Sequence, residues 1–115
     1  MLYISNAFSI NMLHVGGNLS VEFVSRDVIV SRYRFSHMES AVGHVSTAAL
    51  FSRELGREIP ANRTTLRLAE GDILVVGQYR GPRLEEGTTS LPGEEVDWSI
   101  QWAVVTFQGE RPQGW

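Results

Sequence analysis

AALFSRELGREIPANRTTLRLAEGDILVV is the sequence of residues 48–76, and the spacing of its apolar side chains changes partway through. The first part has the spacing of an amphipathic helix, whose apolar face carries Ala48, Phe51 and Leu55. Gly56 follows as the expected C-cap residue. Beyond Pro60, apolar and polar residues alternate over 66–68, and a turn leads into the apolar run 73–76, which predicts a hairpin of strands. A helix followed by strands indicates a mixed α and β domain.

Signals of regular structure flank this segment on both sides. In chain order they are a first strand at Met1–Ser5, a helical turn capped by Ser9, a hairpin of strands at 19–23 and 28–31 joined by Arg26-Asp27, helical character over 36–55 interrupted by Gly43, and a last strand at Ile100–Phe107. Residues 79–97 show no periodicity and contain several glycines and prolines, as functional or mobile loops do. We therefore expect one α/β or α+β domain over residues 1–107, with a mixed sheet of about five to six strands flanked by helices. Residues 108–115 are expected to form a flexible, frayed tail.

The composition excludes several classes of protein. The chain has 115 residues and no cysteine, so disulfides and thiolate metal sites are excluded. No apolar run approaches the roughly 20 residues that span a bilayer, and there is no signal-like start, which indicates a soluble, cytoplasmic domain that does not bind membranes. The net charge of −3 argues against binding long nucleic acid, although a few arginines suffice for a small phosphorylated ligand. All ten basic residues are arginine, so no Schiff-base or P-loop lysine is present.

Two segments in the first half of the chain combine residues that could carry chemistry. Polar residues cluster at 6–11, where a strand meets a helical turn whose free N–H groups would suit an anion, although capping by Ser9 alone explains the same pattern. In Gly43-His44-Val45-Ser46-Thr47 the glycine allows close approach of a ligand, and the histidine can give or take a proton. A purely structural histidine is the alternative. The three histidines have neither the spacing nor the frame of a metal site, so no metal is expected.

A third segment lies at 79–87. Arg83 and Glu86 are three residues apart, close enough to face one site in a turn, and an arginine can hold a phosphate through two hydrogen bonds. The alternative is a solvated loop with a surface ion pair of little energetic value.

Together, these segments resemble a family of small viral and bacterial domains, long without an assigned function, that includes the type III anti-CRISPR ring nucleases. The resemblance covers residues 1–107, and the motifs occur in the family's order. The matching motifs are LYISNAFSINML at 2–13, VGHVST at 42–47 and RLEEG at 83–87.

The resemblance implies a homodimer that holds cyclic tetra-adenylate across its two-fold axis. It implies cleavage without metal or cofactor, in which a ribose 2′-hydroxyl attacks its neighbouring phosphate and leaves linear di-adenylate with a 2′,3′-cyclic phosphate. His44 would be the general acid, and Arg83 and Glu86 further catalytic residues. The matching substrate-binding positions are Ser9, Asn6, Asn11, Gln78 and Gly43.

The chain departs from viral members of this family before its last strand, where Pro92-Gly93 interrupts an expected helix, and in a longer loop at 78–83. Both differences affect the lid over the ligand. The implied activity switches off type III CRISPR signalling, either for a virus or as the host's own off-switch. The alternatives are a protein that only sequesters cyclic oligonucleotides and a small nucleic-acid-binding regulator.

Overall fold

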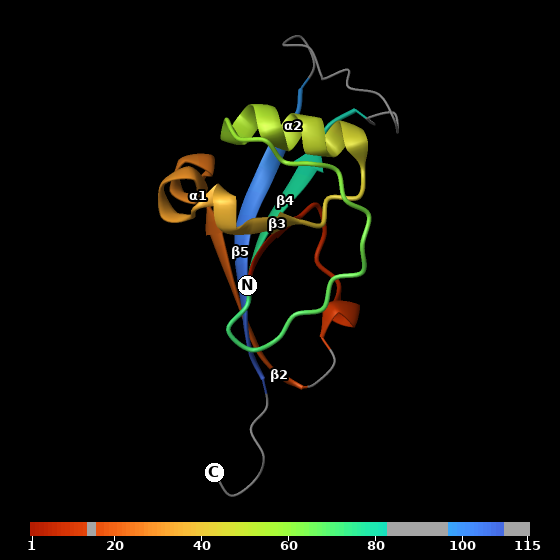
Figure 1. The fold of residues 1–115 in the computed structure, drawn as a ribbon. Helices are drawn as coiled ribbons and strands as arrows, with labels where there is room; N and C mark the ends of the chain where they lie inside the picture. Colours follow the sequence, from red (N-terminus) through yellow and green to blue (C-terminus); the bar gives the residue numbers. More distant parts are fainter. Residues whose placement is uncertain (14–15, 83–96, 110–115) are drawn as a thin grey trace, which may run out of the picture.

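The computed structural model describes residues 1–13, 16–82 and 97–109 of the chain. The elements in chain order are β1 (Leu2–Ser5), η1 (Ile10–Met12), β2 (Gly17–Val24), α1 (Arg26–Arg32), η2 (Phe35–His37), β3 (Met38–Ser40), α2 (Val45–Leu55), β4 (Ile73–Arg80) and β5 (Ser99–Gly109), where η marks a 3-10 turn. The expected α+β class is confirmed. The five strands form one mixed sheet, and the helices α1 and α2 pack against it (Figure 1).

The strand order in the sheet is β2-β5-β4-β1-β3. β1 is parallel to both of its neighbours, β3 and β4, while β5 is antiparallel to both β4 and β2. The chain passes from β3 through α2 to β4, which is a parallel crossover over β1. The carboxyl ends of β3, β1 and β4 therefore point to the same edge of the sheet, where β4 continues for four residues beyond Val76, the last residue paired with β1.

The two faces of the sheet are covered differently. Both helices pack on one face (Figure 1). The buried residues there are Ile4, Ile29, Val42, Ala48, Phe51, Leu55, Ile59, Val75 and Trp102. The other face, called the open face below, is covered only in part, by the irregular segments 8–13 and 66–68. The residues that pack there are Leu66, Leu68, Leu74 and Val105, joined by Tyr3, Phe8, Met12, Leu13, Ala41 and Val76.

The expected hairpin at 19–23 and 28–31 is wrong in its second half, because residues 28–31 belong to helix α1. The Ser25 hydroxyl accepts a hydrogen bond from the Val28 backbone N–H at 3.4 Å, which caps the helix. Asp27 in the first turn and Arg32 in the last turn suit the helix dipole. The helix buries Ile29 completely, and this tertiary contact outweighs the strand preference of three consecutive β-branched residues.

The expected strand at 66–68 is also absent, although its alternation is real. Leu66 and Leu68 are buried and Arg67 is exposed, as predicted. The segment lies over the open face, and its Leu68 N–H donates to the Met12 carbonyl oxygen at 2.8 Å instead of pairing with a strand of the sheet. Alternating burial thus reflects packing on the sheet, which sequence spacing cannot distinguish from pairing within it.

The helical character expected over 36–55 holds only for α2 and the short turn η2, since Met38–Ser40 pairs with β1 as strand β3. Gly56 ends α2 in the left-handed conformation at φ 65°, which confirms it as the C-cap. The last strand is confirmed but extends to Gly109, two residues into the expected tail. None of the helices in the described ranges is long and apolar enough to cross a membrane.

Candidate functional site

The three segments that the sequence singles out all follow strands that end at the same edge of the sheet. Asn6 comes directly after β1, Gly43 and His44 come after β3, and the segment containing Arg83 comes after β4. Ligands of open sheets bind outside the carboxyl ends of parallel strands, where the chain leaves neighbouring strands toward opposite faces. Such a divergence occurs here, because the chain passes from β1 to the open face and from β3 into α2 on the other face.

The segment after β1 is held close to the segment after β3. The Ala41 N–H donates to the Ile4 carbonyl oxygen at 2.8 Å, which extends the β1–β3 pairing by one residue. The buried Ser5 hydroxyl donates to the Ala41 carbonyl oxygen at 3.4 Å and accepts from the Ala7 N–H at 3.3 Å. Ser9 then caps η1, as predicted, through its hydroxyl oxygen and the Asn11 N–H at 3.2 Å. Ser9 and Asn11 are exposed.

The backbone before His44 is fixed by contacts with residues 60–63. The Asn62 side-chain amide donates to the Ser40 carbonyl oxygen at 2.7 Å, and its backbone N–H donates to the Val42 carbonyl oxygen at 2.8 Å. The Ser40 hydroxyl donates to the Pro60 carbonyl oxygen at 2.6 Å and accepts from the Val42 N–H at 3.2 Å. These bonds leave the turn that carries Gly43 little freedom, as a preorganised site requires.

His44 is the N-cap residue of α2 and is half-buried. Its Nδ1 accepts a hydrogen bond from the Thr47 backbone N–H at 3.3 Å, and the Thr47 hydroxyl oxygen lies 3.3 Å from the same nitrogen. A backbone N–H can only donate, so Nδ1 carries no proton in this arrangement and the neutral ring has its proton on Nε2. Nε2 has no hydrogen-bond partner in the described part of the chain and is the nitrogen left for a ligand.

Gln78 is exposed, two residues beyond the pairing of Ser5 with Val76. It lies on the open face, because Leu74, four residues earlier on the same strand, packs there. Gln78 therefore shares a face with the segment after β1, whereas α2 lies on the other face. Arg83 and Glu86 lie outside the described residues, as does His14.

Arg63 is a candidate that the sequence analysis did not single out. Its Cγ would lie 3.6 Å from a Cβ added to Gly43, and its guanidinium Nη2 donates to the Gly43 carbonyl oxygen at 3.4 Å. A guanidinium group thus lies beside the turn that leads into His44, where it could bind a phosphate. No local sequence signal marks Arg63, since only the packing of residues 60–63 on the β3–α2 turn brings it there. No group of three His, Asp or Glu side chains within the described ranges could hold a metal ion.

The fold and this edge define a small α+β domain with a candidate ligand site at the carboxyl ends of its parallel strands. A family model described as STIV B116-like matches residues 2–102, and the chain belongs to that family. B116 of Sulfolobus turreted icosahedral virus has a similar structure, with a TM-score of 0.70 over 91% of this chain and 97% of that one. The two sequences are 24% identical, so this likeness shows the fold alone. No curated protein matches the sequence.

Proposed function

We propose that this B116-like domain is a ring nuclease that cleaves cyclic tetra-adenylate without a metal ion. The observation that carries the proposal is that the segments after β1, β3 and β4 reach one edge of the sheet. That edge has a histidine with a free Nε2 and a nearby arginine, Arg63. Positioned donors of this kind suit a phosphodiester whose nucleophile belongs to the substrate itself, because the protein then has only to align and protonate.

In the proposed reaction the ribose 2′-hydroxyl attacks the adjacent phosphorus atom. The P–O2′ bond forms while the P–O5′ bond breaks, the 2′-hydroxyl proton passes to water, and His44 delivers a proton to the departing O5′ from Nε2. Arg83 would stabilise the charge on the phosphoryl oxygens, with Glu86 beside it. Two such cleavages in one ring give two linear di-adenylates that end in 2′,3′-cyclic phosphates. The domain would thereby switch off type III CRISPR signalling, and the viral origin of B116 is compatible with an anti-defence role.

We further propose that the active species is a homodimer that uses the open face. Leu19, Val21 and Phe23 of edge strand β2 are 40%, 53% and 68% exposed. Val21 pairs with Val105, which pairs with Leu74, so these side chains point to the same face as Gln78. An exposed apolar strip of this kind marks an interaction surface. A two-fold axis through this strip would pair two copies of the domain, and a symmetric ring ligand suits such a pair.

The direct test is to incubate the purified protein with cyclic tetra-adenylate in EDTA and to resolve the products by chromatography. We expect linear di-adenylate with a cyclic phosphate end. Binding of the ring without any cleavage would replace the proposal with sequestration. Absence of both binding and cleavage would remove cyclic tetra-adenylate as the ligand, and a strict need for added manganese or magnesium would overturn the mechanism.

A further inference from the structure

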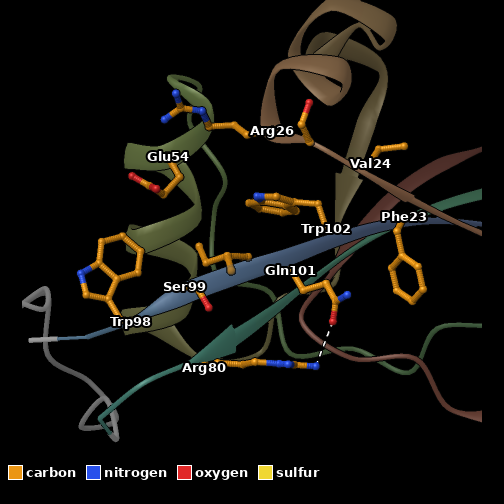
Figure 2. Close-up of a pocket in the computed structure, with 11 residues that line it drawn as sticks. Phe23, Val24, Arg26, Glu54, Arg80, Trp98, Ser99, Gln101 and Trp102 are labelled. Carbon is orange, nitrogen blue, oxygen red and sulfur yellow. Dashed lines mark hydrogen bonds between the residues drawn. The ribbon is translucent and has the colours of Figure 1, made fainter.

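Two hollows of small-molecule size border the face of the sheet that the helices cover, called the helix face below. The larger, of about 660 Å³, lies where β2 ends and β5 begins, and its charged side chains are divided between the two faces (Figure 2). Arg80 donates to the Gln101 side-chain oxygen at 2.9 Å on the open face, whereas Arg26 and Glu54 come from the helices. The smaller hollow, of about 410 Å³, has its basic side chains together on one connection.

The smaller hollow lies at the amino-terminal end of the parallel strands, opposite to the candidate site. Its lining comes from Leu2 and Ile73, the first residues of β1 and β4, and from the connection between α1 and β3. Leu2 packs with the core under the helices, and Ile73 is its partner in the sheet, so both side chains point to the helix face. Tyr33 of the connection packs against the same core. The hollow is therefore on the helix face, away from the exposed apolar strip on the open face.

Basic side chains line this hollow, and none of the acidic residues in the described ranges does. The basic residues are Arg32, Arg34 and His37. Arg32 donates through Nη1 to the Glu22 carboxylate at 2.9 Å, which fixes the guanidinium while leaving it further N–H groups. The Arg34 side chain is exposed and makes no hydrogen bond or ion pair with any residue that the structure describes. Guanidinium groups are thus available here to an anionic ligand.

The one carboxylate that adjoins the hollow in sequence is already occupied. Asp72, which precedes Ile73, is only 9% exposed, and its Oδ2 accepts from the Ala69 N–H at 2.8 Å. It lies toward the open face, where it helps to raise the pKa of Tyr3. The two arginines of the hollow therefore have a single carboxylate partner between them, Glu22, and an anionic ligand would neutralise the remaining positive charge.

The rest of the lining is apolar or aromatic. Leu2, Ile73 and Tyr33 are all half-buried, so part of each side chain is left for a ligand to cover. The Arg32 guanidinium lies 5.9 Å from the centre of the Tyr33 ring, which places a phosphate-binding group beside a flat apolar surface. A ligand that joins a phosphate to a planar apolar body would use both, whereas a bare inorganic anion would use the arginines alone.

We propose that the smaller hollow binds an aryl phosphate monoester, a small planar molecule that carries one phosphate group. The phosphate accepts hydrogen bonds from the guanidinium groups of Arg32 and Arg34 and from a ring N–H of His37. The aromatic body packs on the apolar part of the lining. The inference does not rest on the proposed function, because no step of the cleavage uses this end of the sheet. The hollow also stays open in a dimer formed through the open face.

The test is to titrate the full chain, labelled with ¹⁵N, with phenyl phosphate, inorganic phosphate and phenol in separate experiments. Backbone amide signals are followed by NMR, and affinities are measured by calorimetry. The signals of Arg34, His37 and Gly71 should shift saturably with phenyl phosphate, while that of Gly43 stays in place. Phenyl phosphate should bind at least about tenfold more tightly than phosphate or phenol, because only it uses the arginines and the apolar lining together.

Two matched variants locate the phosphate. Arg34→Gln should lose about tenfold or more in affinity for phenyl phosphate, because it removes a charged donor. Its melting temperature should stay normal, since the exposed Arg34 side chain holds no other described residue. The control Arg26→Gln removes the same charge from the larger hollow and should bind phenyl phosphate normally.

Three results would overturn the proposal: no saturable shift at millimolar phenyl phosphate, equal affinities for phenyl phosphate and inorganic phosphate, or equal losses in the two variants. Shifts centred on Gly43 and His44 with none at residues 32–37 would assign the phosphate to the candidate site and likewise overturn it. Cleavage of cyclic tetra-adenylate by Arg34→Gln is measured in parallel and is expected at the normal rate. Failure of this site is thereby distinguished from failure of the nuclease proposal.

Discussion

The Nδ1 atom of His44 lies 3.3 Å from both the backbone nitrogen and the hydroxyl oxygen of Thr47. The backbone N–H needs an unprotonated Nδ1, whereas the hydroxyl can either donate to that nitrogen or accept from it. If the imidazole becomes charged, Nδ1 gains a proton and the backbone bond is lost, but the Thr47 hydroxyl can accept the new N–H. Thr47 is therefore a positioning residue that allows His44 to change its protonation state without leaving the helix end.

This arrangement predicts opposite results for two substitutions of Thr47. Thr47→Ser keeps the hydroxyl and should cleave at nearly the normal rate. Thr47→Val has a similar shape but cannot accept from a charged imidazole, so turnover should fall about tenfold at neutral pH, equivalent to one lost hydrogen bond of about 1.4 kcal/mol. Turnover of the two variants at neutral pH checks this, and equal rates would assign the hydroxyl no role beyond packing.

A second prediction separates the chemical role of His44 from its role as a helix cap. His44→Ala removes both, and the lost cap should cost about 1 kcal/mol of stability. His44→Asn supplies a good cap without a proton donor, so it should melt near the normal temperature. Both variants should lose about 100-fold or more in turnover, the usual contribution of a general acid, while ring binding changes little. Turnover near the normal rate in the asparagine variant would make His44 structural.

A third prediction concerns Tyr3, a residue of strand β1 that packs on the open face of the sheet. Burial raises the pKa of the Tyr3 phenol, and the nearby carboxylates of Asp72 and Glu39 raise it further. The folded state therefore holds this proton to higher pH than the unfolded state does. Its stabilisation is complete below the unfolded pKa of about 10 and is lost as pH rises through the higher folded value. Thermal melts from pH 8 to 11 should decline less steeply for Tyr3→Phe, and parallel declines would contradict the assignment.

The fold class followed from the sequence because its longest signals were unambiguous. The apolar face of α2, its glycine cap and the long last strand all combine local propensity with matching burial. The errors fell on short segments where tertiary packing decides, as at α1, where one buried isoleucine and a serine cap turn a β-branched run into a helix. For the site, motifs drew attention to His44 and Ser9. Ser9 is a cap as expected, and the structure shows that His44 caps a helix as well. Arg63 could not be found, because only the folded turn brings it to Gly43.

A fourth prediction tests the open face as the dimer surface, using two neighbouring positions on β2. Val21→Asp introduces a charge on the exposed apolar strip, whereas Ser20→Asp introduces the same charge on the opposite face of the same strand. Only Val21→Asp should sediment as a monomer, and only that variant should lose turnover, because each site would then face half a ring without its partner. The unchanged protein should sediment as a dimer at micromolar concentration. Equal behaviour of the two variants would exclude this face.

The last prediction compares two glycines, one in the core and one at the site. A Cβ on Gly77 would lie 2.5 Å from the Trp102 ring and 2.6 Å from the Phe51 ring, which contact each other with centroids 4.9 Å apart. Gly77→Ala must therefore separate this ring pair and should lower the unfolding free energy by about 1–3 kcal/mol.

At Gly43 a Cβ would meet Arg63 only at ordinary contact distances, 3.6 Å and beyond, so Gly43→Ala should melt normally. If a ligand approaches the turn before His44 as closely as the proposed function requires, the same methyl group should weaken binding of cyclic tetra-adenylate. Denaturant unfolding and ligand titration of both variants give the answer. A stable Gly43→Ala protein with normal affinity would show that the ligand does not approach this turn, and an undiminished stability of Gly77→Ala would contradict the close packing of β4 against the aromatic pair.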